Sequence, residues 1–81
     1  MLIPLYGFVR GDTLGLLVLV RAGDTVRALA ESLAQAASVR VAPAARAVVY
    51  RNGAALDPSL TVAEVGLTAL ERVDLVPEEP S

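Results

Sequence analysis

Few side chains of this sequence could do chemistry, because its 81 residues include nine carboxylates but no cysteine or histidine, and all seven basic residues are arginines. Without Cys or His, the chain lacks the usual zinc ligands, thiol chemistry and the Ser–His or Cys–His nucleophiles. Without lysine it cannot form a Schiff base. Six carboxylates fall in residues 52–81, on predicted turns and a tail, where no buried pair for general acid–base catalysis is expected. The residue types predict a binding module rather than an enzyme, with no catalytic, cofactor-binding or metal-binding residues of its own.

Glycine spacing, charge and hydropathy argue against three further kinds of binding. The glycines at 11, 15, 23 and 53 do not have the spacing of a phosphate-binding loop. The pI near 4.9 does not favour nucleic acid. The longest apolar run, Leu14–Val20, is far shorter than the ~18 residues of a membrane span, and no basic segment precedes the apolar residues at the start, as it would in a signal peptide. We expect no nucleic-acid partner, no membrane and a cytoplasmic location.

The charges are divided unevenly along the chain. Residues 1–51 hold six arginines and three acids, for a net charge of +3, whereas residues 52–81 hold Arg72 and six acids, for −5; together these give −2. One interpretation is a solvated surface on which the two signs interleave in the fold. The other is a basic face that docks on an acidic partner.

The first twenty residues predict a β-hairpin. Leu2–Val9 is short, apolar and rich in strand-forming residues, and Leu14–Val20 is a second apolar run. Between them Arg10–Thr13 is polar and contains glycine, as turns do. Two strands joined by so short a connection should pair antiparallel.

An amphipathic helix follows the hairpin. Asp24 or Thr25 can cap its first turn with a side-chain oxygen. The apolar positions that follow have helical spacing and form one stripe: Val26, Leu29, Ala30, Leu33, Ala34 and Ala37. Because Pro43 disfavours helical geometry in the residue before it, the helix should end earlier, near Ala37–Ser38.

The remaining segments predict three strands and one helical turn. The strands are Ala47–Tyr50, Ala54–Leu56 and Arg72–Val76, with an Asn52-Gly53 turn between the first two and a helical turn over Leu60–Val65 that Gly66 stops. This order predicts an α+β protein of β-grasp (ubiquitin-like) architecture. Its mixed sheet should have four to five strands, with one main helix packed on one face. We expect a single domain over residues 1–77 and a short acidic tail over 78–81.

Several short segments form a pattern that runs through nearly the whole chain. They are Pro4-Leu5-Tyr6, Asp24-Thr25-Val26 with Leu29-Ala30-Glu31, Arg40-Val41-Ala42-Pro43, Thr61-Val62-Ala63-Glu64-Val65-Gly66-Leu67, and Val73-Asp74-Leu75-Val76 followed by Glu78-Glu79. In their order and spacing they resemble the system B protein family, the small γ subunits of toluene monooxygenase hydroxylases.

The resemblance implies a non-catalytic accessory subunit of a bacterial multicomponent hydrocarbon monooxygenase. In that family a large α subunit holds a carboxylate-bridged diiron centre, and the ubiquitin-like γ subunit sits on the outside of the hydroxylase. The partner is then the hydroxylase α subunit, and no cofactor is expected in this chain. The residues agree, because diiron sites of this kind use Glu-x-x-His pairs, and the predicted helix carries only Glu31 and no histidine.

Two other roles are open to a ubiquitin-like chain. A conjugated modifier or sulfur carrier needs a free C-terminal Gly-Gly, but no Gly-Gly pair occurs in this sequence, and it has no lysine for side-chain-linked chains. We therefore expect no covalent conjugation. A stand-alone adaptor, similar to the ubiquitin-like accessory protein of type VII secretion, stays possible on the fold alone.

The second predicted strand is apolar on both faces, which points to a protein-binding surface. By the ubiquitin-like register Leu16, Val18 and Val20 face the helix, so that Leu17 and Leu19 point outward, with Val49 and Val76 beside them. Tyr6 and Phe8 share one face of the first strand and are candidate anchors. Arginines and the nearby proline are candidate contacts to an acidic partner. The predicted partner interface is thus Tyr6, Phe8, Leu17, Leu19, Arg21, Arg40, Pro43, Arg46, Val49, Arg51 and Val76.

Overall fold

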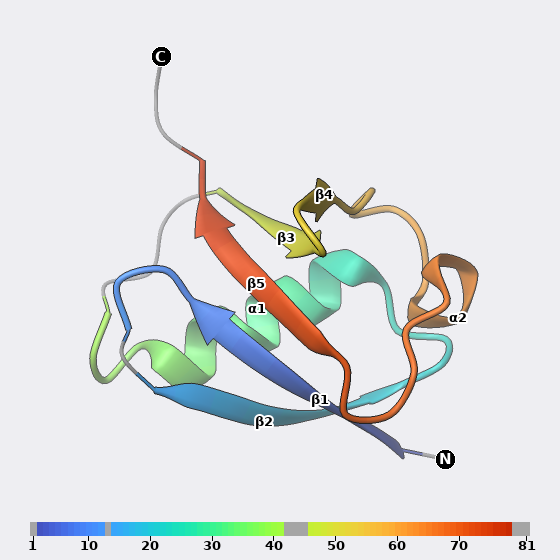
Figure 1. Ribbon diagram of the computed structural model, residues 1–81, viewed down its shortest axis with the longest axis horizontal. Helices are drawn as coiled ribbons and strands as arrows, with labels where there is room; N and C mark the ends of the chain where they lie inside the picture. Colours follow the sequence, from blue (N-terminus) through green and yellow to red (C-terminus); the bar gives the residue numbers. More distant parts are fainter. Residues whose placement is uncertain (1, 13, 42–45, 79–81) are drawn as a thin grey trace.

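One long helix lies across one face of a five-stranded mixed sheet (Figure 1). The computed structural model describes residues 2–12, 14–41 and 46–78. Its strands are β1 (Leu2–Val9), β2 (Gly15–Arg21), β3 (Ala47–Arg51), β4 (Ala54–Ala55) and β5 (Arg72–Pro77), and its helices are α1 (Val26–Ala37) and α2 (Val62–Val65). The predicted β-grasp fold is confirmed, with strand ends shifted by one residue in places.

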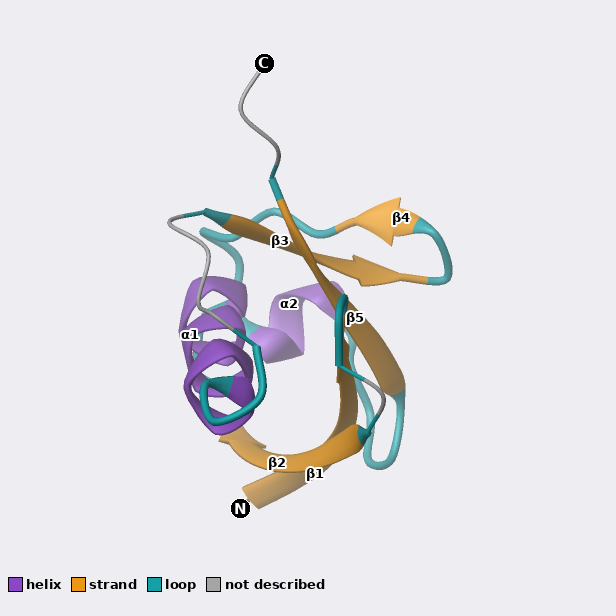
Figure 2. Ribbon diagram, turned by 90° about the vertical axis from the view of Figure 1, so that its left-hand side faces the viewer, coloured by secondary structure: helices purple, strands orange, loops and turns teal. Residues whose placement is uncertain are grey.

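The sheet has the order β2-β1-β5-β3-β4. β1 pairs antiparallel with β2, as the hairpin signal predicts, and parallel with β5 at its other side. β3 pairs antiparallel with both β5 and β4. Figure 2 shows that α1 and α2 lie on the same side of this sheet, so that its other face carries no element of the described chain.

The start of α1 is fixed by Thr25 rather than by Asp24. The Thr25 Oγ1 atom accepts a hydrogen bond from the N–H of Ala28 at 3.1 Å, which satisfies one of the free donors of the first turn. The Asp24 carboxylate instead accepts from the N–H of Arg21 at 2.8 Å and closes the turn after β2. α1 therefore begins at Val26, after the short turn that follows β2.

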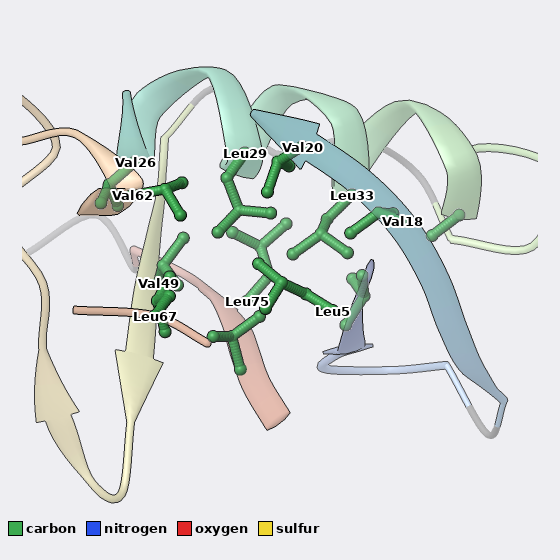
Figure 3. Close-up of a cluster of buried hydrophobic side chains, with 13 residues drawn as sticks. Leu5, Val18, Val20, Val26, Leu29, Leu33, Val49, Val62, Leu67 and Leu75 are labelled. Atoms are coloured by element: carbon green, nitrogen blue, oxygen red, sulfur yellow. The ribbon is translucent and has the colours of Figure 1, made fainter. Parts of the chain in front are cut away.

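The core lies between α1 and the inner face of the sheet (Figure 3). The stripe of α1 enters it through Val26, Leu29, Leu33 and Ala37, as its spacing predicts. Ala30 and Ala34 are only partly buried and flank it. The core contains no polar or charged side chain among the described residues. Burial of these aliphatic groups is the main force that holds the helix on the sheet.

Gly7 of β1 lets α1 approach the sheet closely. Gly7 is buried, and a Cβ atom built on it would overlap Cδ2 of Leu33. Leu33 is itself fully buried, so that its side chain has no space into which to turn. The Leu33 side chain thus occupies the space that a side chain at position 7 would need.

Substitution Gly7→Ala should destabilise the chain by about 1–3 kcal/mol, the usual cost of an extra methyl group in a packed core. The measurement is the midpoint of urea unfolding. Gly23→Ala is the matched control, because nothing lies within 4 Å of a Cβ built at that exposed position. Equal midpoints for the two variants would contradict the close approach of Leu33 to β1.

Candidate partner-binding surface

The face of the sheet away from α1 carries a group of exposed apolar side chains. Leu17 and Leu19 of β2 are 59% and 57% exposed, and the predicted outward orientation of both is confirmed. Leu2 and Tyr6 of β1 are 50% and 45% exposed. Exposed apolar side chains that lie together mark protein-binding surfaces more often than scattered ones do.

The register of β1 and β2 makes these side chains neighbours. Tyr6 lies opposite Leu17, and Pro4 lies opposite Leu19. Side chains in such positions of an antiparallel pair are close enough to contact one another. We call the five residues Leu2, Pro4, Tyr6, Leu17 and Leu19 the outer patch. Leu2 and Pro4 are not in the interface predicted from the sequence, although both share the parity of Tyr6 along β1.

The prediction that Val49 belongs to this surface is wrong. Val49 is 2% exposed and lies opposite Leu75, which is also buried, so that both face the core. The outward residue of β3 beside Val76 is Val48, and both are half-buried. Val76 belongs to β5, and because β1 lies between β5 and β2, Val76 does not lie beside Leu17.

Phe8 continues the outer face but is enclosed by its neighbours. The guanidinium carbon of Arg72 lies 4.1 Å from the centre of the Phe8 ring. On the other side, a Cβ atom built on Gly15 would lie 2.9 Å from the ring, so that the ring covers this glycine. Arg72 also forms an ion pair with Asp74 at 3.1 Å. Phe8 therefore packs within the sheet face more than it projects from it.

Two of the predicted interface arginines are engaged within the chain. Arg40 binds both carboxylate oxygens of Asp12, at 2.9 Å and 3.0 Å from Nε, and Nη2 lies 2.8 Å from Oδ2. These hydrogen bonds raise the pKa of Arg40 above its ordinary value. The Asp12 side chain is 1% exposed. The pair joins the β1–β2 turn to the segment after α1, and so Arg40 is not a free docking charge.

Arg51 joins β3 to the segment that precedes β5. Its Nε atom lies 2.6 Å from the Glu71 carboxylate, and its Nη1 donates to the carbonyl oxygen of Val65 at 2.7 Å. Burial acts to raise the pKa of Glu71, but hydrogen bonds from Thr68 and the Arg51 charge lower it overall. Arg51 thus connects segments of the fold, and its charge is engaged within the chain.

Arg21, Arg46 and Pro43 complete the predicted interface. Arg21 is exposed at the end of β2, opposite Leu2, and extends the outer patch with a positive charge. Arg46 lies apart from this patch. Pro43 lies outside the described residues.

A groove of about 580 Å³ lies on the opposite side of the molecule, between α1 and β3. Its lining includes Ala30 and Ala34, whose small side chains leave space, and Arg46 and Glu78 are among its charged lining residues. This groove is not predicted from the sequence, although two alanines on the flank of the helical stripe are a signal for it.

The described residues hold no cluster of three or more Asp and Glu side chains arranged to bind a metal ion. None of the helices in the described part of the chain has the length and apolar character needed to cross a membrane.

Comparisons with known proteins show a family match over most of the chain and a similar solved structure. The family model of Toluene-4-monooxygenase system protein B (TmoB) matches residues 2–76. A chain of the structure "Toluene 4 monooxygenase HD Complex with Inhibitor 4-Bromobenzoate" is similar, with a TM-score of 0.88 and 29% identity over 96% of this chain and 100% of that one. No curated protein matches the chain in sequence.

Two more distant structures share the fold. Caldiarchaeum subterraneum ubiquitin has a TM-score of 0.77 and 17% identity, over 100% of this chain and 99% of its own. The ubiquitin-like domain of Plasmodium falciparum Dsk2 has a TM-score of 0.78 and 19% identity, over 96% of this chain and 100% of its own.

The lowered pKa of Glu71 predicts a pH dependence of stability. Since the folded chain favours the charged carboxylate, this group stabilises the fold above its ordinary pKa of about 4.3, and the contribution is lost as the pH falls through the lowered value. The urea midpoint of the wild type should therefore fall more steeply between about pH 5 and pH 3 than that of Glu71→Gln.

Glu31→Gln is the control for this comparison. Glu31 is exposed on α1, and no ion pair involves it among the described residues. The urea midpoint of Glu31→Gln should change with pH as that of the wild type does. Parallel profiles for Glu71→Gln and the wild type would show that the Arg51 pair adds nothing to stability.

Proposed function

The chain belongs to the Toluene-4-monooxygenase system protein B family and is an accessory subunit of a monooxygenase, and from this premise we propose that it binds the large α subunit of the hydroxylase and supports its assembly. In this role it takes no catalytic part. The observation that carries the proposal is the outer patch, because exposed apolar side chains that lie together on one face of a small chain mark a surface for another protein.

The donor atoms of the chain support the placement of the metal centre in the partner. Carboxylate-bridged diiron sites combine glutamates with histidines on facing helices. This chain has no histidine, and its one long helix carries a single carboxylate, that of the exposed Glu31. Its residues do not fit such a centre, so that we assign the diiron centre to the α subunit.

The same residues support a non-covalent mode of action. The 81 residues contain no pair of consecutive glycines and no lysine, the two features on which conjugation of ubiquitin-like modifiers depends. We propose that the chain acts only through its surface.

Co-expression of the tagged chain with the hydroxylase subunits tests the proposed function. We expect the α subunit to be recovered with the tagged chain after affinity purification and to be identified by mass spectrometry. Recovery of the folded chain without any hydroxylase subunit, from cells that contain them, would overturn the proposal.

Substitution Leu17→Asp or Leu19→Asp should leave the fold intact, because both side chains are exposed. Recovery of the α subunit should fall at least about tenfold, since an unpaired carboxylate is costly to bury in an apolar contact. Val39→Asp is the matched control, because Val39 is 82% exposed and follows α1, on the other side of the sheet. Equal recovery with all three variants would exclude the outer patch as the interface.

A further inference from the structure

The free edge of β2 offers backbone hydrogen bonds to a partner, in addition to the apolar contacts of the outer patch. β2 is the first strand in the sheet order, so that within the described chain it has a neighbour strand on one side only. The backbone groups on its other side need hydrogen-bond partners from water or from another chain. The pairing of β1 with β5 and β2 shows which residues of β2 carry these groups.

The hydrogen bonds of β1 fix the directions of the β2 backbone groups. The N–H of Tyr6 donates to the carbonyl oxygen of Glu71 at 2.9 Å, so that even-numbered residues of β1 direct their N–H and C=O groups toward β5. The odd-numbered residues of β1 therefore bond with β2, where the register places even-numbered residues opposite them. The odd-numbered residues Leu17 and Leu19 consequently direct their N–H and C=O groups to the free edge.

Arg21 agrees with this alternation and closes one end of the edge. Its N–H donates to the Asp24 carboxylate at 2.8 Å, and its carbonyl oxygen accepts from the N–H of Asp24 at 3.0 Å. Both of its edge groups are thus paired within the chain. Among the described residues, nothing is paired with the edge groups of Leu17 and Leu19.

The two edges of the sheet differ in their protection. The edge at β4 is two residues long and follows a tight turn, which leaves little to pair with. The edge at β2 is seven residues long, contains no proline or lysine, and pairs with β1 without a bulge. Proteins usually protect exposed edge strands with charges, proline or bulges. A long, regular and apolar edge without them is suited to pair with another strand.

We infer that β2 receives an extended strand of the hydroxylase partner, which bonds to the N–H and C=O groups of Leu17 and Leu19 and continues the sheet beyond β2. This inference rests on the proposed function and specifies how the partner is held. The added strand places alternate side chains beside the two leucines on the outer face, where apolar residues fit. A carboxylate in the added strand fits near the exposed Arg21.

A second copy of the chain fits this edge less well. Two copies of β2 can pair antiparallel about Val18, with Leu17 of one opposite Leu19 of the other. Such edge-to-edge pairing leaves both outer patches uncovered. A stable interface buries about 800 Å² on each partner, about a sixth of the 5171 Å² surface of this chain. Edge pairing along a single strand of seven residues supplies far less, whereas a larger partner can cover the outer patch as well.

Comparison of Leu19→Pro with Leu19→Ala in the co-expressed complex tests the inference. Both variants lack the leucine side chain, but only proline lacks the N–H that points to the edge. Because that N–H has no bond within the described chain, proline should be tolerated in the free subunit, as it is in edge strands generally. We expect recovery of the α subunit to be at least about tenfold lower with Leu19→Pro than with Leu19→Ala.

Amide hydrogen exchange of the wild-type chain is a second readout that needs no variant to fold. The amide of Val18, which bonds to β1, should exchange slowly in the free chain, whereas those of Leu17 and Leu19 should exchange rapidly. In the purified complex the two leucine amides should slow by at least about tenfold.

The outcomes separate the inference from the proposed function. If no hydroxylase subunit is recovered even with the wild type, both fail. If it is recovered, but Leu19→Pro and Leu19→Ala recover equal amounts and the leucine amides stay rapid, only strand addition is overturned. If sedimentation shows that the free chain is a dimer that Leu19→Pro dissociates, the edge receives a second copy and the partner assignment is overturned.

Discussion

A single helix can cover only one face of a sheet, and the rest of this structure depends on that constraint. α1 lies close to the inner face because Leu33 occupies the space above Gly7, and buried aliphatic residues between the helix and the sheet form the core of the described chain. The part of the chain that the structure describes has no second long helix to place on the other face. Apolar side chains on that face are therefore left to solvent or to another protein.

Ion pairs hold the periphery of this small core and determine which charges remain for a partner. Arg51 connects the basic first part of the chain to the acidic last part through Glu71, and Arg40 is paired with Asp12. The interpretation in which opposite charges interleave in the fold thus holds for Arg51. Both pairs fix the segments that they join. Arg21, at the end of β2, keeps its positive charge beside the outer patch.

The sequence predicts those features that have a clear period. The stripe of α1 repeats at helical spacing, so that its inward face is predicted correctly. β3 starts with Ala47, Val48 and Val49, three apolar residues without alternation, and for this reason its parity was predicted wrongly. The neighbours of the outer patch depend on the parallel pairing of β1 with β5, between strands more than 60 residues apart. The Arg40–Asp12 pair, separated by 28 positions, has no local sequence signal either.

The outer patch and the β2 edge are not independent surfaces, because Leu17 and Leu19 belong to both. Side-chain direction and backbone hydrogen-bond direction alternate along a strand with the same period of two. In β2 they coincide, so that the residues with outward side chains are also those with open backbone groups. A strand that bonds to these groups therefore places its own opposing side chains on the outer face. A shift of one residue would turn those side chains to the other face. The edge would thus set the register of the partner strand, and the apolar side chains of the patch would supply most of the buried area.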